Sequence, residues 1–156
     1  MQLEDVITKN PATVHPDASI RSATKIMRDD QIGFLPVLAD GIVLGVVTDR
    51  DVVIRAIAGG FDPQSTPVRD IMTTNPIQLL ATDSIEKALE IMAARAIARL
   101  VITDPSGKMV GVLSCGDLAT ACKGDDRAGQ LRAAIHRRTY RSKQIQAPPD
   151  AQFVSD

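Results

Sequence analysis

Two short stretches of the chain carry the residue types that most directly suggest chemistry. Residues 45–51 read Gly-Val-Val-Thr-Asp-Arg-Asp, and residues 111–117 read Gly-Val-Leu-Ser-Cys-Gly-Asp. Each combines a glycine, two aliphatic residues, a hydroxyl residue and an aspartate in the same order. The pattern is typical of a buried strand that leads directly into the first turn of a helix. A hydroxyl and a carboxylate at such a junction suggest either a helix cap or a site for a sugar and a phosphate.

The local interpretation of these residues is a capping box. The hydroxyls of Thr48 and Ser114 would accept a bond from an early helical N–H, and Asp51 and Asp117, three residues on, would reach back. The other interpretation is a nucleoside site, because the N–H groups of a helix N-terminus attract phosphate and a carboxylate can accept both hydroxyls of a ribose. The repetition in register favours the second interpretation, as does a glycine that lets another group approach the backbone.

The elements that would position these residues follow from periodicity and turn residues. A short extended segment at 13–14 precedes a helix that starts near residue 20 and ends at Gly33. A buried strand over 34–38 is followed by an Asp40-Gly41 hairpin turn and a returning strand over 42–47. A second helix is expected from Thr48 to about Ala58.

The same order of elements begins again at residue 68. Ile20 and Met27 of the first expected helix reappear 65 residues later as Ile85 and Met92, and the offset becomes 66 after the second hairpin gains one residue. A repeat of this length indicates an internal duplication. One copy is too small to bury both faces of its sheet, so we expect the two copies to pack against each other.

We therefore predict an α+β fold of two β-α-β-β-α repeats packed with pseudo-twofold symmetry. The expected organisation is a first domain over 1–60, a linker over 61–67 that contains two prolines, a second domain over 68–123 and a basic extension over 124–156.

Composition excludes several functional classes. The chain of 156 residues is 44% hydrophobic, lacks Trp and has a formal net charge of −1, which argues against a nucleic-acid or membrane surface. No stretch approaches the roughly 20 apolar residues of a membrane span, and the acidic N-terminus has no apolar signal core. Cys115 and Cys122 lack metal-site or redox-motif spacing, so we expect two reduced thiols in a cytoplasmic protein.

The C-terminal segment differs from the rest of the chain. Residues 121–156 carry seven basic and four acidic residues. Apolar residues such as Leu131 and Ile135 could form one face of a short helix, and the last residues are expected to be extended or partly disordered. Two interpretations stay open: a tail packed on its own acidic module, or a docking arm for an acidic partner or nucleic acid.

The ordered series of motifs resembles a tandem pair of cystathionine β-synthase (CBS) domains over residues 3–122. Each motif alone is weak, and the specificity lies in the order and the repetition. The first copy carries Asn10-Pro11, Thr13-Val14, Leu35-Pro36-Val37 and the Gly45, Thr48, Asp51 series. The resemblance implies a regulatory module that binds AMP, ADP, ATP, S-adenosylmethionine or NAD in clefts between the two repeats.

The resemblance also implies two sets of binding residues. The aspartate of each junction would hold the ribose, and backbone near the extended segment and the first hairpin strand would contact adenine. The first set is Thr13, Val14, Phe34, Pro36, Thr48 and Asp51. The second set is Gln78, Leu79, Arg99, Val101, Ser114 and Asp117.

The two sets are not equivalent. Val101 stands where the family favours proline, and Cys115-Gly116 replaces Asp49-Arg50. If Arg50 neutralises phosphate, the first site prefers the more phosphorylated ligand; the alternative is that Arg50 is a solvated helix residue.

The predicted function is non-catalytic, because the chain has no catalytic constellation at a supported spacing, no GxGxxG and no Walker loop. No cofactor is required, and the adenosyl nucleotide acts as a regulatory ligand, for example in energy sensing. The output would pass to an unknown target protein, most simply through a homodimer that uses helical faces. The alternative is a structural dimerisation or adaptor protein with vestigial clefts.

Overall fold

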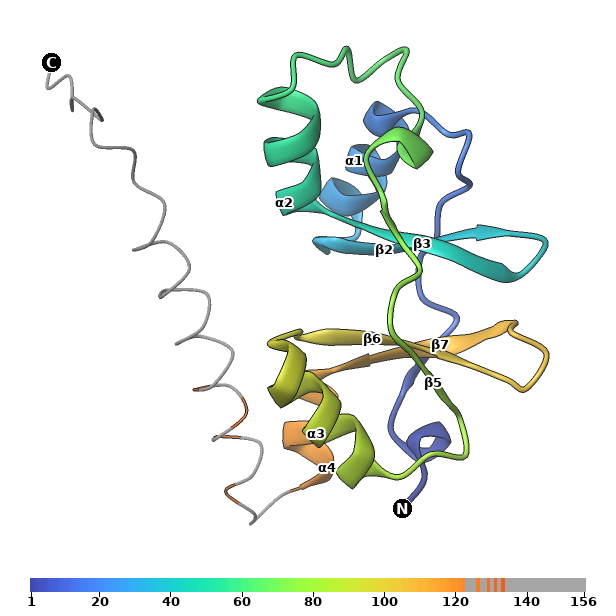
Figure 1. Ribbon diagram of the computed structural model, residues 1–156, viewed down its shortest axis with the longest axis vertical. Helices are drawn as coiled ribbons and strands as arrows, with labels where there is room; N and C mark the ends of the chain where they lie inside the picture. The colour runs from blue at the N-terminus through green and yellow to red at the C-terminus, as the bar shows by residue number, and fades with distance from the viewer. Residues whose placement is uncertain (123–125, 127–128, 130, 132, 134–156) are drawn as a thin grey trace, which may run out of the picture.

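The computed structural model describes residues 1–122 together with 126, 129, 131 and 133 (Figure 1). The predicted basic extension therefore lies almost entirely outside the described residues. The helices are η1 (Leu3–Asp5), α1 (Ile20–Asp29), α2 (Asp49–Asp51), η2 (Val52–Ile57), η3 (Val68–Asp70), α3 (Ile85–Arg95) and α4 (Cys115–Ala121). The strands are β1 (Thr8–Lys9), β2 (Phe34–Ala39), β3 (Ile42–Thr48), β4 (Thr73–Thr74), β5 (Gln78–Leu80), β6 (Arg99–Thr103) and β7 (Met109–Ser114).

The predicted α+β fold of two repeats is confirmed. Each repeat runs from an extended segment through a helix and a β-hairpin to a second helix. The two leading segments differ in length, because the first repeat makes a single parallel bridge from Val14 to Val37, whereas β5 forms a parallel strand against β6. Figure 1 shows the two sheets facing each other across the middle of the molecule, with helices on their outer sides.

Local sequence signals set the ends of these elements. Ser19 and Ser84 cap α1 and α3, since their hydroxyl oxygens accept bonds of 3.1 and 3.2 Å from backbone N–H groups three residues on. The first hairpin turns at Asp40 and Gly41, whose φ angles of 51° and 80° fit a tight turn between antiparallel strands.

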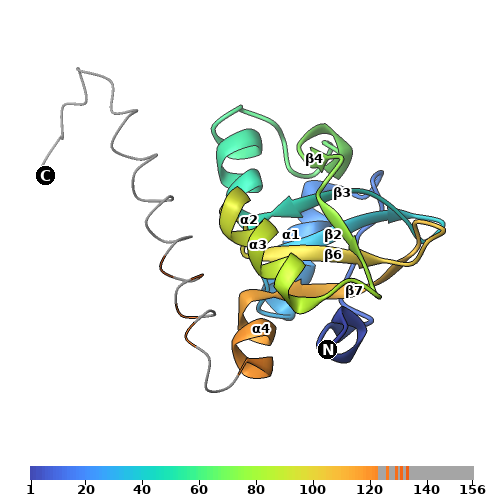
Figure 2. The same cartoon turned by 60° about the horizontal axis from the view of Figure 1, so that its bottom comes forward.

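The two repeats exchange their edge strands. In the three-stranded sheet, β4 from the start of the second repeat pairs with β3, and Figure 2 shows it along that edge. In the four-stranded sheet, β1 from the start of the first repeat pairs with β7. Each sheet is therefore completed by the other repeat.

Two glycines make this exchange possible. A Cβ on Gly45 would lie 2.7 Å from the Thr73 carbonyl oxygen, and a Cβ on Gly111 would lie 2.6 Å from the Thr8 carbonyl oxygen. These distances are far below ordinary contact, so only glycine lets the exchanged strands approach. The group that approaches the backbone here is the other repeat.

The hydrophobic cores follow the same exchange. Leu3 is fully buried in the core of the second repeat, and Val68 and Ile71 are buried in the core of the first. Leu131, one of the described residues of the C-terminal segment, is also buried in the second core. The spatial units thus do not follow the order of the chain.

The helix expected from Thr48 to about Ala58 is divided into two forms. An α-helical turn at Asp49–Asp51 continues as the π-helix η2, in which the Ala58 N–H donates to the Val53 carbonyl. Within η2, Val52 and Ala56 are buried. Its residues Val53, Ile54 and Ile57 are exposed, as is the following Phe61.

Candidate functional site

Both strand-to-helix junctions form complete capping boxes. The Asp51 N–H donates to Thr48 Oγ1 over 3.1 Å, and the Thr48 N–H donates to Asp51 Oδ2 over 3.0 Å. At the second junction, the Asp117 N–H donates to Ser114 Oγ over 3.1 Å and the Ser114 N–H donates to Asp117 Oδ2 over 2.7 Å. The local interpretation of the sequence is therefore correct for both pairs.

Capping does not exhaust the hydrogen-bonding capacity of Asp51. A carboxylate has about four lone-pair positions on its two oxygens. Oδ2 is used in the cap, while Oδ1 lies 3.5 Å from Nη2 of Arg55. The Asp51 side chain is 15% exposed and lines a cavity, so it can still accept hydrogen bonds from the hydroxyl groups of a ligand.

A cleft of about 720 Å³ lies where the two repeats meet. Its lining comes from the α2 junction and hairpin of the first repeat and from the leading segment and hairpin of the second. The lining residues are Gly33, Phe34, Val46, Thr48, Asp49, Arg50, Asp51, Thr73, Asn75, Pro76, Ile77, Ala96, Ile97, Ala98, Arg99 and Val101. A cavity of this size suits a small-molecule ligand.

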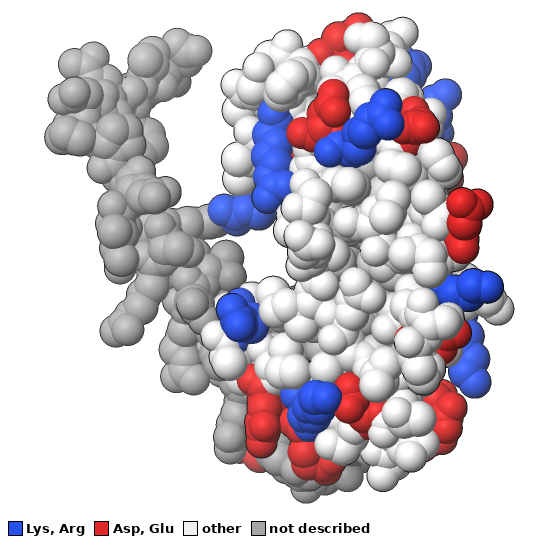
Figure 3. Space-filling model, turned by 45° about the vertical axis from the view of Figure 1, so that its right-hand side comes forward, with Lys and Arg blue, Asp and Glu red and all other residues white. Residues whose placement is uncertain are grey.

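The cleft combines an apolar interior with a few charged groups. Its apolar side chains include Ile77, Ile97 and Val101. Its charged side chains are those of Asp49, Arg50, Asp51 and Arg99. Figure 3 shows one face on which Lys, Arg, Asp and Glu side chains gather mostly toward the two ends, leaving a largely uncharged middle. Apolar walls with a small number of polar groups are typical of ligand pockets.

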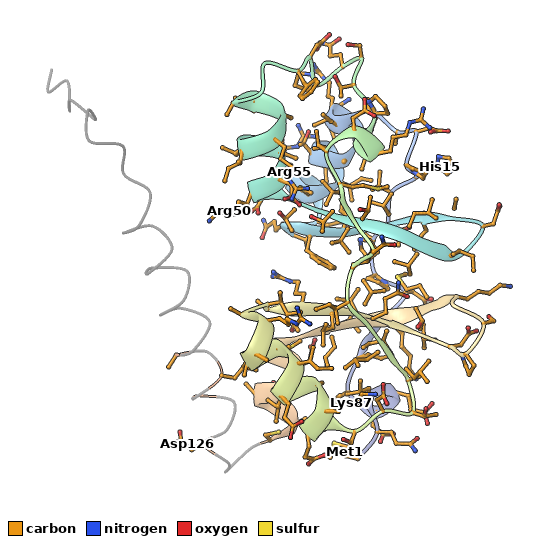
Figure 4. The ribbon with its side chains drawn as sticks, viewed as in Figure 1. Met1, His15, Arg50, Arg55, Lys87 and Asp126 are labelled. Atoms are coloured by element: carbon orange, nitrogen blue, oxygen red, sulfur yellow. The ribbon has the colours of Figure 1, made fainter. Side chains whose placement is uncertain are left out.

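Two arginines have defined positions at this cleft. The Arg99 guanidinium lies over the Phe34 ring, with 6.0 Å between Cζ and the ring centroid. Arg50 lies within the capping turn, and its backbone N–H donates to Asp49 Oδ1 over 2.8 Å. Figure 4 shows Arg50 and Arg55 extending from the same helical segment.

Six of the predicted site residues line this one cleft, and they come from both predicted sets. The first repeat supplies Phe34, Thr48, Arg50 and Asp51, and the second repeat supplies Arg99 and Val101. The cleft is built from the junction of one repeat and the hairpin of the other.

The other predicted residues lie outside the lining of this cleft. Val14 and Leu79 are buried in the first and second hydrophobic cores, respectively. Pro36 is also buried, Thr13 is half-buried and Gln78 is exposed. Ser114 and Asp117 belong to the second junction, at α4.

Sequence reasoning missed the segment Asn75–Ile77 and the loop Ala96–Ala98 as lining residues. Asn75-Pro76 repeats the Asn10-Pro11 motif of the first copy, but its position against the other repeat depends on the exchange of β4. Arg55 was missed as well, because its contacts with Asp51 and with Ile71 are side-chain contacts within the folded structure.

Among the residues that the structure describes, no cluster of three or more His, Cys, Asp or Glu side chains could hold a metal ion. The same part of the chain contains no helix with the length and apolar character needed to cross a bilayer. Cys115 is buried, with its thiol 3.8 Å from the sulfur of Met92.

Comparison with known proteins agrees with this architecture. The family model for the CBS domain matches residues 3–57 and 68–124. The CBS domain-containing protein YhcV of Bacillus subtilis is 36% identical over 133 residues, which cover 85% of this chain and 94% of YhcV.

Two solved structures extend the comparison to bound ligands. The crystal structure of CBSX2 in complex with AMP has a TM-score of 0.70 and 25% identity, and the match covers 78% of this chain and 96% of CBSX2. The CBS domain pair of MJ0100 in complex with 5′-methylthioadenosine and S-adenosyl-L-methionine also has a TM-score of 0.70 and 25% identity, with coverage of 80% and 97%.

Proposed function

The chain belongs to the CBS domain family, whose model matches both of its repeats, and we propose that it is a non-catalytic regulatory module that binds an adenosine-containing ligand between those repeats. The observation that carries this proposal is the cleft of about 720 Å³, whose lining includes Asp51 of one repeat and residues of the other. The ligands in the CBSX2 and MJ0100 structures, AMP, 5′-methylthioadenosine and S-adenosylmethionine, share adenosine.

Each part of an adenine nucleotide has a complementary group in the cleft. The purine would lie against the apolar side chains of Ile77, Ile97 and Val101. The ribose hydroxyls would donate to Asp51, as a carboxylate suits a pair of hydroxyl donors. Arg50, which also lines the cleft, would pair with phosphate oxygens.

We propose a second cleft, related to the first by the pseudo-twofold symmetry of the two repeats. It would use Ser114 and Asp117 with Thr13, Val14 and Pro36 of the first repeat. Gly116 stands at the position that corresponds to Arg50, so this second cleft lacks that cation. The first cleft should therefore prefer the more phosphorylated ligand.

Titration calorimetry with AMP and ATP on the wild type, Asp51→Ala and Asp117→Ala tests this assignment. Each substitution removes the carboxylate that closes a capping box, so this part of the structural loss is common to both variants. We expect Asp51→Ala to lose ATP binding to a greater extent than Asp117→Ala. Equal losses would contradict the inequality of the clefts, and no binding of AMP or ATP by the wild type would contradict the assignment of an adenine nucleotide to either cleft.

Regulation requires that ligand binding change the relation between the two repeats or between chains. A ligand that contacts both repeats shifts such an equilibrium only by its differential affinity for the two states. The proposed output is a cytoplasmic target protein reached through a homodimer.

A specific observation supports a second candidate function, that of an adaptor. Val53, Ile54 and Ile57 of η2 and the neighbouring Phe61 are large apolar side chains exposed by 47–59% in one short segment, here called the apolar face. Such a face suits a protein interface, including a homodimer. A thermal-shift screen with AMP, ATP, S-adenosylmethionine and NAD separates the candidates, since a ligand at 100 times its Kd stabilises by about 2.7 kcal/mol. No shift with any of them would favour the adaptor.

A further inference from the structure

Arg55 makes two contacts that connect the first junction to the exchanged segment that begins the second repeat. Its Nη1 donates to the carbonyl oxygen of Ile71 over 2.9 Å, and its Nη2 lies 3.5 Å from Asp51 Oδ1. Asp51 lines the cleft on the side of the first repeat. Ile71 precedes β4 and the segment 73–77, which supplies four further lining residues and pairs with β3 through β4.

We infer that Arg55 is a positioning residue that sets the specificity of the cleft for a ribose diol. Its guanidinium orients the carboxylate of Asp51 and ties that carboxylate to the segment carrying Thr73 to Ile77. The inference deepens the proposed function and rests on it for the identity of the ligand.

The orientation of the carboxylate follows from how its two oxygens are held. Oδ2 accepts from the Thr48 N–H at 3.0 Å, and Oδ1 lies beside the guanidinium. A side chain held at both oxygens has one direction in which to present its remaining lone pairs. Two adjacent hydroxyls of a ribose fit that arrangement, whereas a deoxyribose makes one bond fewer.

The planar guanidinium is needed for the connection. Arginine presents its donors in a rigid fork, so two of its nitrogens can reach two different acceptors at once. The Arg55 side chain is 45% exposed, yet its tip is fixed by one carbonyl and one carboxylate. A lysine would carry the same charge on a single nitrogen and would not bridge both groups with the same geometry.

The second repeat supplies a natural comparison. Ala121 stands at the position that corresponds to Arg55, at the same offset of 66 that relates Asp51 to Asp117. Val6 corresponds in the same way to Ile71, at the offset of 65. The second junction therefore keeps its capping box without an arginine at this position. An arginine that joins the capping aspartate to the exchanged segment is found at the first junction and not at the second.

Binding of AMP, 2′-deoxy-AMP and 3′-deoxy-AMP to Arg55→Met and Arg55→Lys tests the ribose role. An Asp117→Asn background restricts the measurement to the first cleft. The preference of the parent for AMP over either deoxy analogue should fall about fivefold or more in Arg55→Met, as for one lost charge-assisted hydrogen bond. Arg55→Lys should recover only part of that preference. A loss of affinity that is equal for AMP and its analogues would overturn the inference.

Hydrogen exchange of the ligand-free protein tests the connection independently. Arg55→Met should speed exchange of amides in residues 71–75, while the corresponding residues 6–10 keep their wild-type rates. Unchanged exchange in 71–75, or equal acceleration in both segments, would contradict the connection. If the parent bound neither AMP nor its analogues, the ribose role would fail, the four-ligand thermal-shift screen would decide the proposed function, and the exchange result would still decide whether Arg55 joins the first junction to the exchanged segment.

Discussion

Arg99 and Phe34 occupy the same position in the two repeats and contact each other at the cleft between them. They are 65 residues apart in the chain, and the Arg99 guanidinium carbon lies 6.0 Å from the centroid of the Phe34 ring. Both side chains line the cleft between the repeats. The two repeats have therefore diverged at a position where they contact each other: the first supplies the aromatic ring of Phe34 and the second the guanidinium of Arg99.

This contact should contribute measurably to stability. For Phe34→Leu, Arg99→Met and the double variant, urea unfolding should give a coupling energy of about 0.5–1 kcal/mol, the usual range for an exposed cation–π pair. Because the charge lies over the ring face, the second substitution should cost less stability once the first partner has been removed. Strictly additive losses would mean that the two side chains do not interact in solution.

Gly45→Ala should destabilise the protein by about 1–3 kcal/mol, because overpacking displaces neighbouring backbone. The added Cβ would lie 2.7 Å from the Thr73 carbonyl oxygen and would push β4 away from β3. Gly116→Ala is the matched control, since its nearest neighbour is Ser114 Oγ at 3.4 Å and helix α4 favours alanine. Thermal unfolding compares the two variants. A Gly45→Ala protein as stable as the wild type would refute the close approach.

Leu3→Ala should cost about 2–5 kcal/mol despite its place at the start of the chain. The side chain is fully buried in the core of the second repeat. Hydrogen exchange should show lost protection in β6 and β7 before any loss in β2 and β3. Met1→Ala serves as the control, because Met1 is 72% exposed. Lost protection centred on the first repeat would contradict the exchanged packing.

The apolar face of Val53, Ile54, Ile57 and Phe61 should mediate the proposed homodimer. Ile54→Lys places a charge in that face and should shift the protein to a monomer, as measured by light scattering after size exclusion. Thr120→Lys is the control, because Thr120 is the exposed counterpart of Ile54 in the second repeat. Unchanged mass for Ile54→Lys would exclude this face as the dimer contact.

Short-range signals account for the part of the structure that the sequence predicted. The elements, the Asp40-Gly41 turn and both capping boxes depend on residues a few positions apart, and the duplication is visible because the same local pattern returns 65 to 66 residues later. Hydrophobic periodicity and turn residues encode such features directly. The assignment of the chain to two repeats needed no more than these patterns.

The composition of the cleft depended on the tertiary structure. The exchange of β1 and β4 brings Thr48 and Asp51 together with Asn75 to Ile77 and Arg99, and it makes Gly45 a site of backbone contact. By itself, the sequence determined the repeats and the two junctions, because these rest on local hydrogen bonds and periodicity. Only the tertiary structure decided which segments of the two repeats share a cleft, because strand pairing between distant segments depends on packing that no local pattern records.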